Sequence, residues 1–118
     1  MCTEGTSFIP LLSANSSIPW KSAAFSQYPR MQVSGNMMMG YSIRTARYRY
    51  TEWIFYDYVT YQPLWERHRL FAELYDGATD PEGNNNVVED HRYAAVRKQL
   101  SQQLRNGWRM ALPRNTRP

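Results

Sequence analysis

The fold is decided by residues 39–53, which read MGYSIRTARYRYTEW. Side-chain types alternate with a period of two on both sides of Thr45 and Ala46, as in strands that turn one face toward a core. Both halves are rich in β-branched and aromatic residues, which suit a pleated, half-buried surface. The stretch therefore predicts a β-hairpin. Because neither Thr45 nor Ala46 favours a positive φ, the pattern indicates a loop longer than a two-residue turn. The alternation groups Tyr41, Ile43 and Thr45 in the first arm and Tyr48, Tyr50 and Ile54 in the second.

The chain before the hairpin contains one more strand candidate. Residues 22–28 alternate in the same way, and Pro29 is expected to end this strand because proline has no N–H for the ladder. Arg30 would then leave the sheet in a loop. Gly35-Asn36 is a turn signal, and the three methionines at 37–39 are expected to pack softly or to begin the next strand.

The chain after the hairpin continues as strand. Residues 55–61 keep the strand composition, and Gln62-Pro63 is expected to interrupt it. Residues 64–69 resemble an insertion between two strands. Residues 70–76 then predict the last strand, with small or aliphatic side chains at every second position.

From about residue 89 to residue 107 the period changes from two to 3.6, which predicts one amphipathic helix. Asp90 or Asn86 can cap its first N–H groups, and Gly107 is a plausible end. Strands followed by one terminal helix give an α+β fold, with about four antiparallel strands and a C-terminal helix packed on one face. The apolar stripe of the helix consists of Tyr93, Val96, Leu100, Leu104 and Trp108.

The charge of the chain comes mainly from arginine. Fourteen Lys and Arg against ten Asp and Glu give a formal net charge of +4, and only Lys21 and Lys98 are lysine. Arginine favours planar, bidentate contacts with carboxylate, sulfate or phosphate groups. Nine Tyr and four Trp place much of the apolar content in large rings. Such a surface suits an anionic ligand or another protein domain, and equally an ordinary solvated surface.

The residues argue against several kinds of site. Cys2 is the only cysteine, so an internal disulfide and a cysteine-based zinc site are excluded. His68 and His91 lie too far apart for a local metal motif. An Asn-rich loop bracketed by acids could bind a cation, although Asx residues more commonly form turns and caps. No signal peptide or apolar stretch long enough for a membrane helix is evident. The bracketing acids are Asp76, Asp80, Glu82 and Asp90.

Four collinear segments resemble one family. They lie at residues 4–12, 24–30, 40–53 and 73–87, and they resemble the C-terminal region of iduronate-2-sulfatase-like sulfatases, which are type I sulfatases. This resemblance implies the small C-terminal subdomain of the sulfatase fold. Residues 1–19 would match the end of a catalytic domain, residues 20–113 would be the subdomain, and residues 114–118 would be a basic tail.

The resemblance also implies an activity for the parent enzyme, the hydrolysis of a sulfate ester of a sugar. That family uses calcium and formylglycine, which is made in a Cys/Ser-x-Pro-x-Arg motif. No such motif occurs here: Cys2 has no proline or arginine at the required offsets, and Ser17-Ile18-Pro19-Trp20-Lys21 lacks the arginine. We therefore expect a fragment that is not catalytic by itself and that works with an N-terminal sulfatase catalytic domain, in cis or in trans. Parent enzymes are usually lysosomal, periplasmic or secreted, and the sequence leaves the location of this chain open.

The resemblance points to two residues for the edge of a substrate pocket, Arg30 and Tyr28. Arg30 is the arginine of the matching Gln-Tyr-Pro-Arg segment, which lies toward the active-site rim in the family. A buried ion pair that locks two subdomains together is the competing role for Arg30.

Two other functions remain open at this point. The chain could be a protein-interaction module that docks on a separate catalytic domain. It could also bind nucleic acid, because the arginines of the hairpin alternate with aromatic rings that could stack on bases. An arginine-laced sheet with cross-strand ring pairs explains the same residues, so no nucleic acid is expected. The arginines concerned are Arg44, Arg47 and Arg49.

Overall fold

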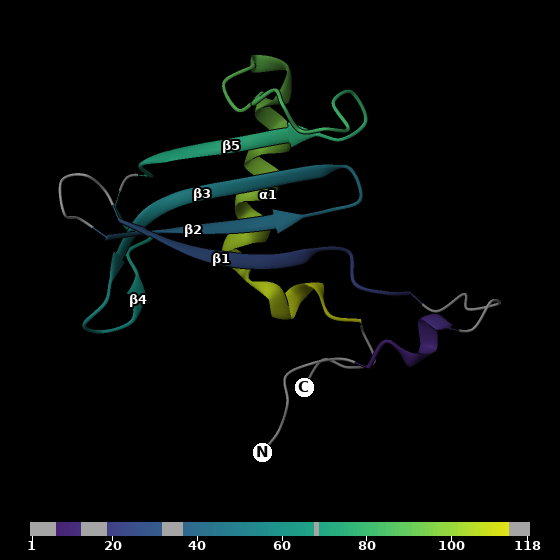
Figure 1. Ribbon diagram of the computed structural model, residues 1–118, viewed down its shortest axis with the longest axis horizontal. Helices are drawn as coiled ribbons and strands as arrows, with labels where there is room; N and C mark the ends of the chain where they lie inside the picture. The colour runs from purple at the N-terminus through teal and green to yellow at the C-terminus, as the bar shows by residue number, and fades with distance from the viewer. Residues whose placement is uncertain (1–6, 13–18, 32–36, 68, 114–118) are drawn as a thin grey trace.

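The computed structural model describes residues 7–12, 19–31, 37–67 and 69–113. Its main sheet is antiparallel, with the spatial order β1-β2-β3-β5, and the short β4 pairs with the end of β3. One helix, α1, crosses one face of the sheet (Figure 1). The elements in chain order are η1 (Ile9–Leu12), β1 (Ala24–Met31), β2 (Met37–Arg44), β3 (Tyr48–Asp57), β4 (Gln62–Pro63), β5 (Phe71–Asp76), η2 (His91–Tyr93), α1 (Ala94–Asn106) and η3 (Trp108–Ala111). The predicted α+β fold is confirmed.

The predicted hairpin is formed by β2 and β3. Ile43 lies opposite Tyr50, and the connection comprises three residues, Thr45 to Arg47, so the loop is longer than a two-residue turn. Thr45 holds this loop twice, because its N–H donates to the Tyr48 carbonyl (2.9 Å) and its Oγ1 accepts from the Tyr48 N–H (2.9 Å). Hydroxyl bonding to nearby backbone thus replaces the positive-φ residues of a tight turn.

Some predicted strand boundaries are wrong. Pro29 does not end β1, which continues to Met31, and Arg30 stays in the sheet opposite Met38. This is possible because β1 is an edge strand, where the missing N–H of Pro29 points away from the ladder. The strand expected over residues 55–61 ends at Asp57 instead, because residues 58–61 form a turn. Gln62 and Pro63 then form β4 and pair with Asp57 and Tyr56, so they do not interrupt the sheet. The turn predicted at Gly35-Asn36 lies outside the described residues, as does the basic tail 114–118.

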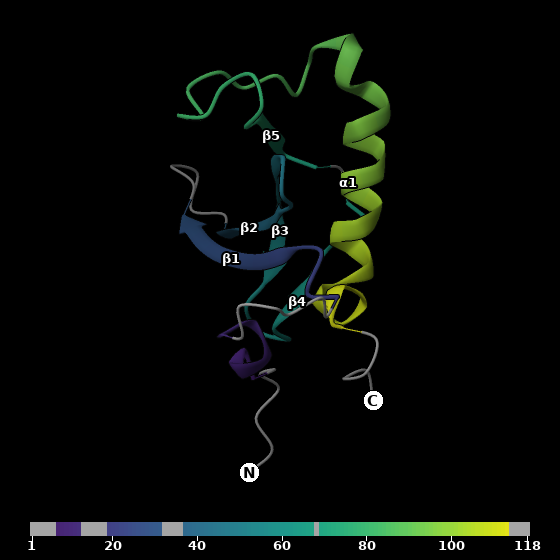
Figure 2. The ribbon, with the colours of Figure 1, turned by 90° about the vertical axis from the view of Figure 1, so that its right-hand side faces the viewer.

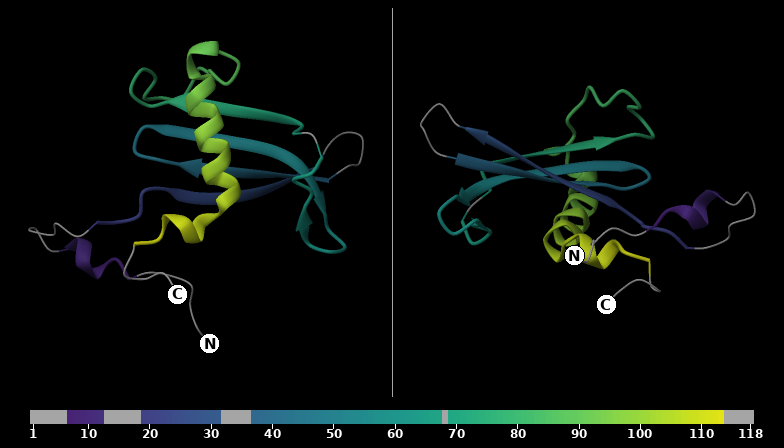
Figure 3. Two further views of the ribbon diagram at one scale, coloured as in Figure 1. Left: turned by 180° about the vertical axis from the view of Figure 1, so that it is seen from behind. Right: turned by 60° about the horizontal axis from the view of Figure 1, so that its bottom comes forward.

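The core lies between α1 and one face of the sheet, as Figure 2 shows from the side and Figure 3 from behind. Leu100 and Leu104 of α1 are buried on a cluster that includes Ile43, Tyr50 and Leu74. Tyr93 and Val96 pack at the margin of this cluster, so the predicted apolar stripe is confirmed from Tyr93 to Leu104. Trp108, its last predicted member, lies beyond α1 in η3. Burying these side chains supplies most of the driving force for folding, at about 25 cal/mol per Å2 of apolar surface. Among the described residues, no helix is long and apolar enough to cross a membrane.

Asp90 and Gly107 lie at the two ends of the helical segment as predicted, but the α-helix itself begins later than expected. Asp90 caps the 3-10 turn η2 by accepting from the Arg92 N–H (2.9 Å), and α1 proper starts four residues later, at Ala94. Gly107 ends α1 with φ 81° and ψ 167°. Only glycine adopts this backbone region readily. Asn86 has another role: its Oδ1 accepts from the Leu74 N–H (2.9 Å) on the outer edge of β5.

Candidate functional site

Tyr28 and Arg30, the two residues expected at a pocket edge, lie on the sheet face that α1 leaves uncovered. Side chains alternate along β1, so both point away from Phe25, which packs toward the helix. Arg30 places its guanidinium over the Trp53 ring, 5.4 Å from the ring centroid, and Tyr28 is exposed. No ion pair between described residues involves Arg30. The structure thus places the Arg30 guanidinium over an aromatic ring.

Trp53 lies under the Arg30 guanidinium on this face, and three other residues contact its ring. Its Nε1–H donates to Glu73 Oε1 (2.9 Å), Phe71 stacks on it at 5.4 Å, and its ring lies over Gly40. A Cβ at Gly40 would lie 2.9 Å from the Trp53 ring, so only glycine leaves room for it. Trp53 is consequently only 8% exposed on a sheet face without a helix. A ring fixed in this way can orient the Arg30 guanidinium above it.

The opposite face contains a buried carboxylate that the sequence interpretation missed. Glu52 is 0% exposed under α1, where its Oε1 accepts from the Tyr50 hydroxyl (2.8 Å) and its Oε2 from Nη2 of Arg105 (2.9 Å). Nη1 of Arg69 adds a bond to the Tyr50 hydroxyl (3.0 Å) and lies 3.9 Å from Oε1. Burial and the adjacent Glu52 carboxylate raise the pKa of Tyr50 to about 12, so its hydroxyl stays a donor at neutral pH. The signal in the sequence was a glutamate at a core-facing position of an alternating strand.

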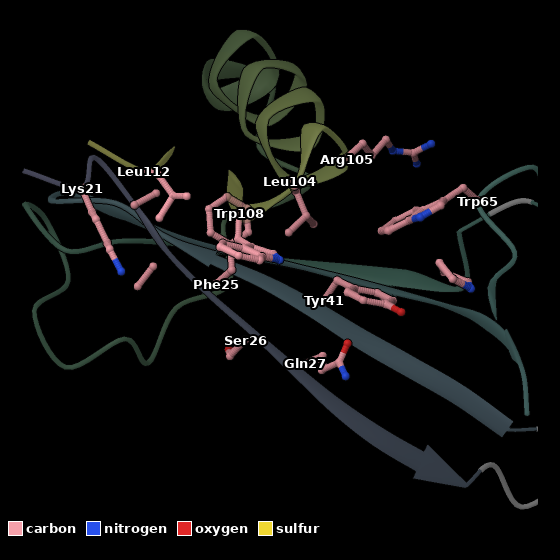
Figure 4. A pocket seen from close by; sticks show the side chains of 14 residues that line it. Lys21, Phe25, Ser26, Gln27, Tyr41, Trp65, Leu104, Arg105, Trp108 and Leu112 are labelled. Carbon is pink, nitrogen blue, oxygen red and sulfur yellow. The ribbon is translucent and has the colours of Figure 1, made fainter. Parts of the chain in front are cut away.

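A groove of about 700 Å3 opens beside this carboxylate, between β1, β2 and the C-terminal end of α1. Figure 4 shows Trp108 and Tyr41 in its middle, Lys21 toward one end, and Trp65 with Arg105 toward the other. The Arg105 guanidinium stacks over Trp65 at 5.1 Å. Burial, and secondarily the nearby Tyr56 and Tyr58, raise the pKa of Tyr41 to about 12. The groove is therefore mostly apolar, with cations at its ends, and Trp65 of the expected insertion lines part of it.

Three of the four acids considered for a cation site bond to groups of the chain itself. Asp76 is held by Arg47 (two contacts of 2.7 Å) and by the Tyr93 hydroxyl (3.0 Å). Asp80 accepts from the Asn85 N–H (2.7 Å), and Asp90 is the cap described above. Within the described ranges, no group of three or more His, Cys, Asp or Glu side chains could hold a metal ion.

The hairpin arginines considered for nucleic-acid binding make different contacts. Arg47 pairs with Asp76 and stacks on Tyr48 at 4.9 Å, and Arg49 stacks on Tyr75 at 4.5 Å. Arg44 is exposed at the end of β2. These contacts agree with the arginine-laced sheet expected from the sequence.

The fold and the sequence together define the class of protein. The family model for N-sulphoglucosamine sulphohydrolase, C-terminal, matches residues 2–109, and the chain belongs to this family of sulfatase C-terminal domains. Among individual relatives, iduronate 2-sulfatase of Mus musculus is 32% identical over an alignment of 89 residues, and this match covers 66% of this chain. The same match covers 16% of the mouse enzyme, so the chain corresponds to about a sixth of that relative. The resemblance drawn from four short segments is confirmed.

Proposed function

We propose that this chain is the C-terminal subdomain of a sulfatase that hydrolyses sulfate esters, and that it is not catalytic by itself. Family membership supports the sulfatase assignment. The absence of a Cys/Ser-x-Pro-x-Arg motif from the sequence supports the non-catalytic role, because the family's nucleophile is made in that motif. The N-terminal catalytic domain, in cis or in trans, would supply formylglycine and calcium.

Within that enzyme, Arg30 and Tyr28 would form part of the rim of the substrate pocket. The observation that carries this proposal is the Arg30 guanidinium held over Trp53, with no carboxylate of the described residues paired to it. A guanidinium in a fixed orientation can bind a sulfate or carboxylate through two parallel N–H donors. Tyr28, two residues away on the same face, could add a hydroxyl donor. An acidic sugar sulfate is the substrate class that fits these two groups.

Complementation tests the proposal. An aryl-sulfatase assay with calcium is run on the chain alone, on a formylglycine-containing sulfatase catalytic domain alone, and on the mixture. Activity only in the mixture is the expected result, and activity of the chain alone would contradict the non-catalytic role. In an active mixture, Arg30→Ala should raise the KM for an acidic sugar sulfate, with partial rescue by Arg30→Lys. Lys98→Ala, on the exposed side of α1, is the matched control and should leave KM unchanged.

A further inference from the structure

The two outer edges of the main sheet differ in whether their outward backbone groups are hydrogen-bonded by other described residues. On β5 the outward backbone groups are covered by the chain itself: Leu74 N–H donates to Asn86 Oδ1 (2.9 Å), and the Leu74 carbonyl accepts from the Val87 N–H (2.9 Å). Asn86 Nδ2 also donates to the Ala72 carbonyl (3.3 Å). On β1 no such cover exists among the described residues. An uncovered edge is a ready template for another strand.

The register shows which groups of β1 point outward. Thr45 N–H donates to the Tyr48 carbonyl, and backbone bonds alternate along a strand, so Ile43 and Tyr41 bond toward β3. The even-numbered residues of β2 then bond toward β1, where their partners are also even-numbered. The N–H and C=O groups of Phe25 and Gln27 therefore point away from the sheet. The nitrogen of Pro29, like those of Phe25 and Gln27, points away from β2, which explains how a proline fits in β1. Because this nitrogen carries no hydrogen, the edge that can pair with another strand ends before Pro29.

The side chains around this edge specify its partner. Neither β1 nor β2 contains an acidic residue, and both contain an arginine on the helix-free face, Arg30 and Arg44. All ion pairs between described residues use other cations, and Lys21 is also outside them. On the helix side, the residues opposite Phe25 and Gln27 in an added strand would point toward the groove beside Tyr41 and Trp108.

We propose that the outer edge of β1, over residues 24–28, binds an extended acidic segment of a partner protein as an additional strand. Apolar side chains of that segment lie in the groove, and its carboxylates lie on the other face near Arg30 and Arg44. Backbone hydrogen bonds supply affinity, and the alternating pockets and charges supply specificity. A second copy of the chain fits poorly, because pairing two β1 edges would bring Arg30, Arg44 and Lys21 of both copies together without a carboxylate on either strand.

The test uses the full chain and two synthetic peptides with blocked ends. One alternates glutamate with valine and tyrosine, and the other has lysine in place of every glutamate. We expect the acidic peptide to bind and to slow amide exchange at Phe25 and Gln27 at least about tenfold, the equivalent of about one to two backbone hydrogen bonds. Ser26 and Tyr28, which already bond to β2, should not change. Binding without protection at Phe25 and Gln27, equal binding of the basic peptide, or no binding would overturn the proposal.

A pair of variants at one position checks the edge directly. Gln27→Pro removes an outward N–H without touching the ladder to β2 and should weaken binding by about tenfold, while Gln27→Thr keeps the N–H and should bind as the parent does. Sedimentation of the free chain completes the test. A dimer with Phe25 and Gln27 protected in the absence of peptide would assign the edge to a second copy and overturn the proposal. None of these measurements requires sulfatase activity, so they are independent of the proposed function.

Discussion

Arg105 of α1 reaches across the core to donate a 2.9 Å hydrogen bond from Nη2 to Oε2 of Glu52 in β3, 53 residues earlier in the chain. This contact ties the end of the helix to the central strand. It also places a positive charge beside the completely buried carboxylate of Glu52, while Arg105 itself is partly exposed.

Removing Arg105 should cost more stability than removing both charges. Arg105→Ala leaves the Glu52 carboxylate buried with the Tyr50 hydroxyl as its one close donor, and we expect a loss of about 2–3 kcal/mol. Arg69, 3.9 Å from Glu52 Oε1, would then be its remaining cation. Glu52→Gln in the Arg105→Ala background removes the under-compensated charge and should restore part of that loss. Urea unfolding of the two single variants and the double variant measures the coupling, with Lys98→Ala as a neutral control. A double variant less stable than Arg105→Ala would contradict the assignment.

Asp76 should make stability depend on pH in the acid range. Bidentate bonding from Arg47 holds the pKa of Asp76 well below its usual range, with smaller contributions from the Ala78 N–H and the Tyr93 hydroxyl, while burial opposes the shift. The folded chain then binds fewer protons than the unfolded chain, whose Asp76 has a pKa of about 3.9. The stabilisation is fully present above that value and is lost as pH falls through the folded pKa.

The pH prediction is checked by urea unfolding between pH 5 and pH 2. The parent chain should lose stability more steeply on acidification than Asp76→Asn, which cannot ionise. Asp57, Asp80 and Asp90 also have lowered pKa values, but they contribute equally to both proteins. Parallel curves for the parent and Asp76→Asn would show that the Arg47 contact does not act as described.

Gly40→Ala should destabilise the sheet through its contact with Trp53. The new Cβ would meet the Trp53 ring at 2.9 Å, and this ring is held by Phe71 and Glu73, so we expect a loss of about 1–3 kcal/mol. In a Trp53→Leu background the same substitution should cost less than about 1 kcal/mol, because the obstructing ring is gone. Thermal unfolding of the four proteins decides between this contact and a general intolerance of alanine at position 40.

Gly107→Ala should destabilise the chain for a different reason. Apart from its chain neighbours, no described residue comes within 4 Å of the position that a Cβ would occupy, but φ 81° and ψ 167° are strained for any side chain, at a cost of about 1–3 kcal/mol. Gln102→Ala, on the exposed side of α1, is the control and should be nearly neutral. Equal stability of Gly107→Ala and the parent would mean that the helix ends in another conformation.

The elements were predictable wherever a local pattern continued long enough. The hairpin, the last strand and the amphipathic helix follow from periods of two and 3.6, which depend only on neighbouring residues. Two of the wrong boundaries involve proline. Pro29 and Pro63 were interpreted as interruptions, yet a proline fits a strand when its nitrogen points away from a partner, and only strand order shows which way it points.

The candidate site was predictable in part. The resemblance identified Arg30 and Tyr28, and the fold then placed Arg30 over Trp53 rather than in a loop. Glu52 was not recognised, because a glutamate in an alternating strand is usually exposed and its partner Arg105 lies far away in sequence.

By itself, the sequence determined the family, the strand and helix types, and the side chains that share each face, since these properties depend on local spacing and on matched motifs. Only the tertiary structure decided that Glu52 is buried beside Arg105, that Trp53 lies under Arg30, and that no described residue covers the outer edge of β1 while Asn86 covers that of β5. The physical reason is common to all three: each depends on which strands are neighbours and which face α1 covers, and contacts between residues far apart in the chain leave no periodic pattern in the sequence.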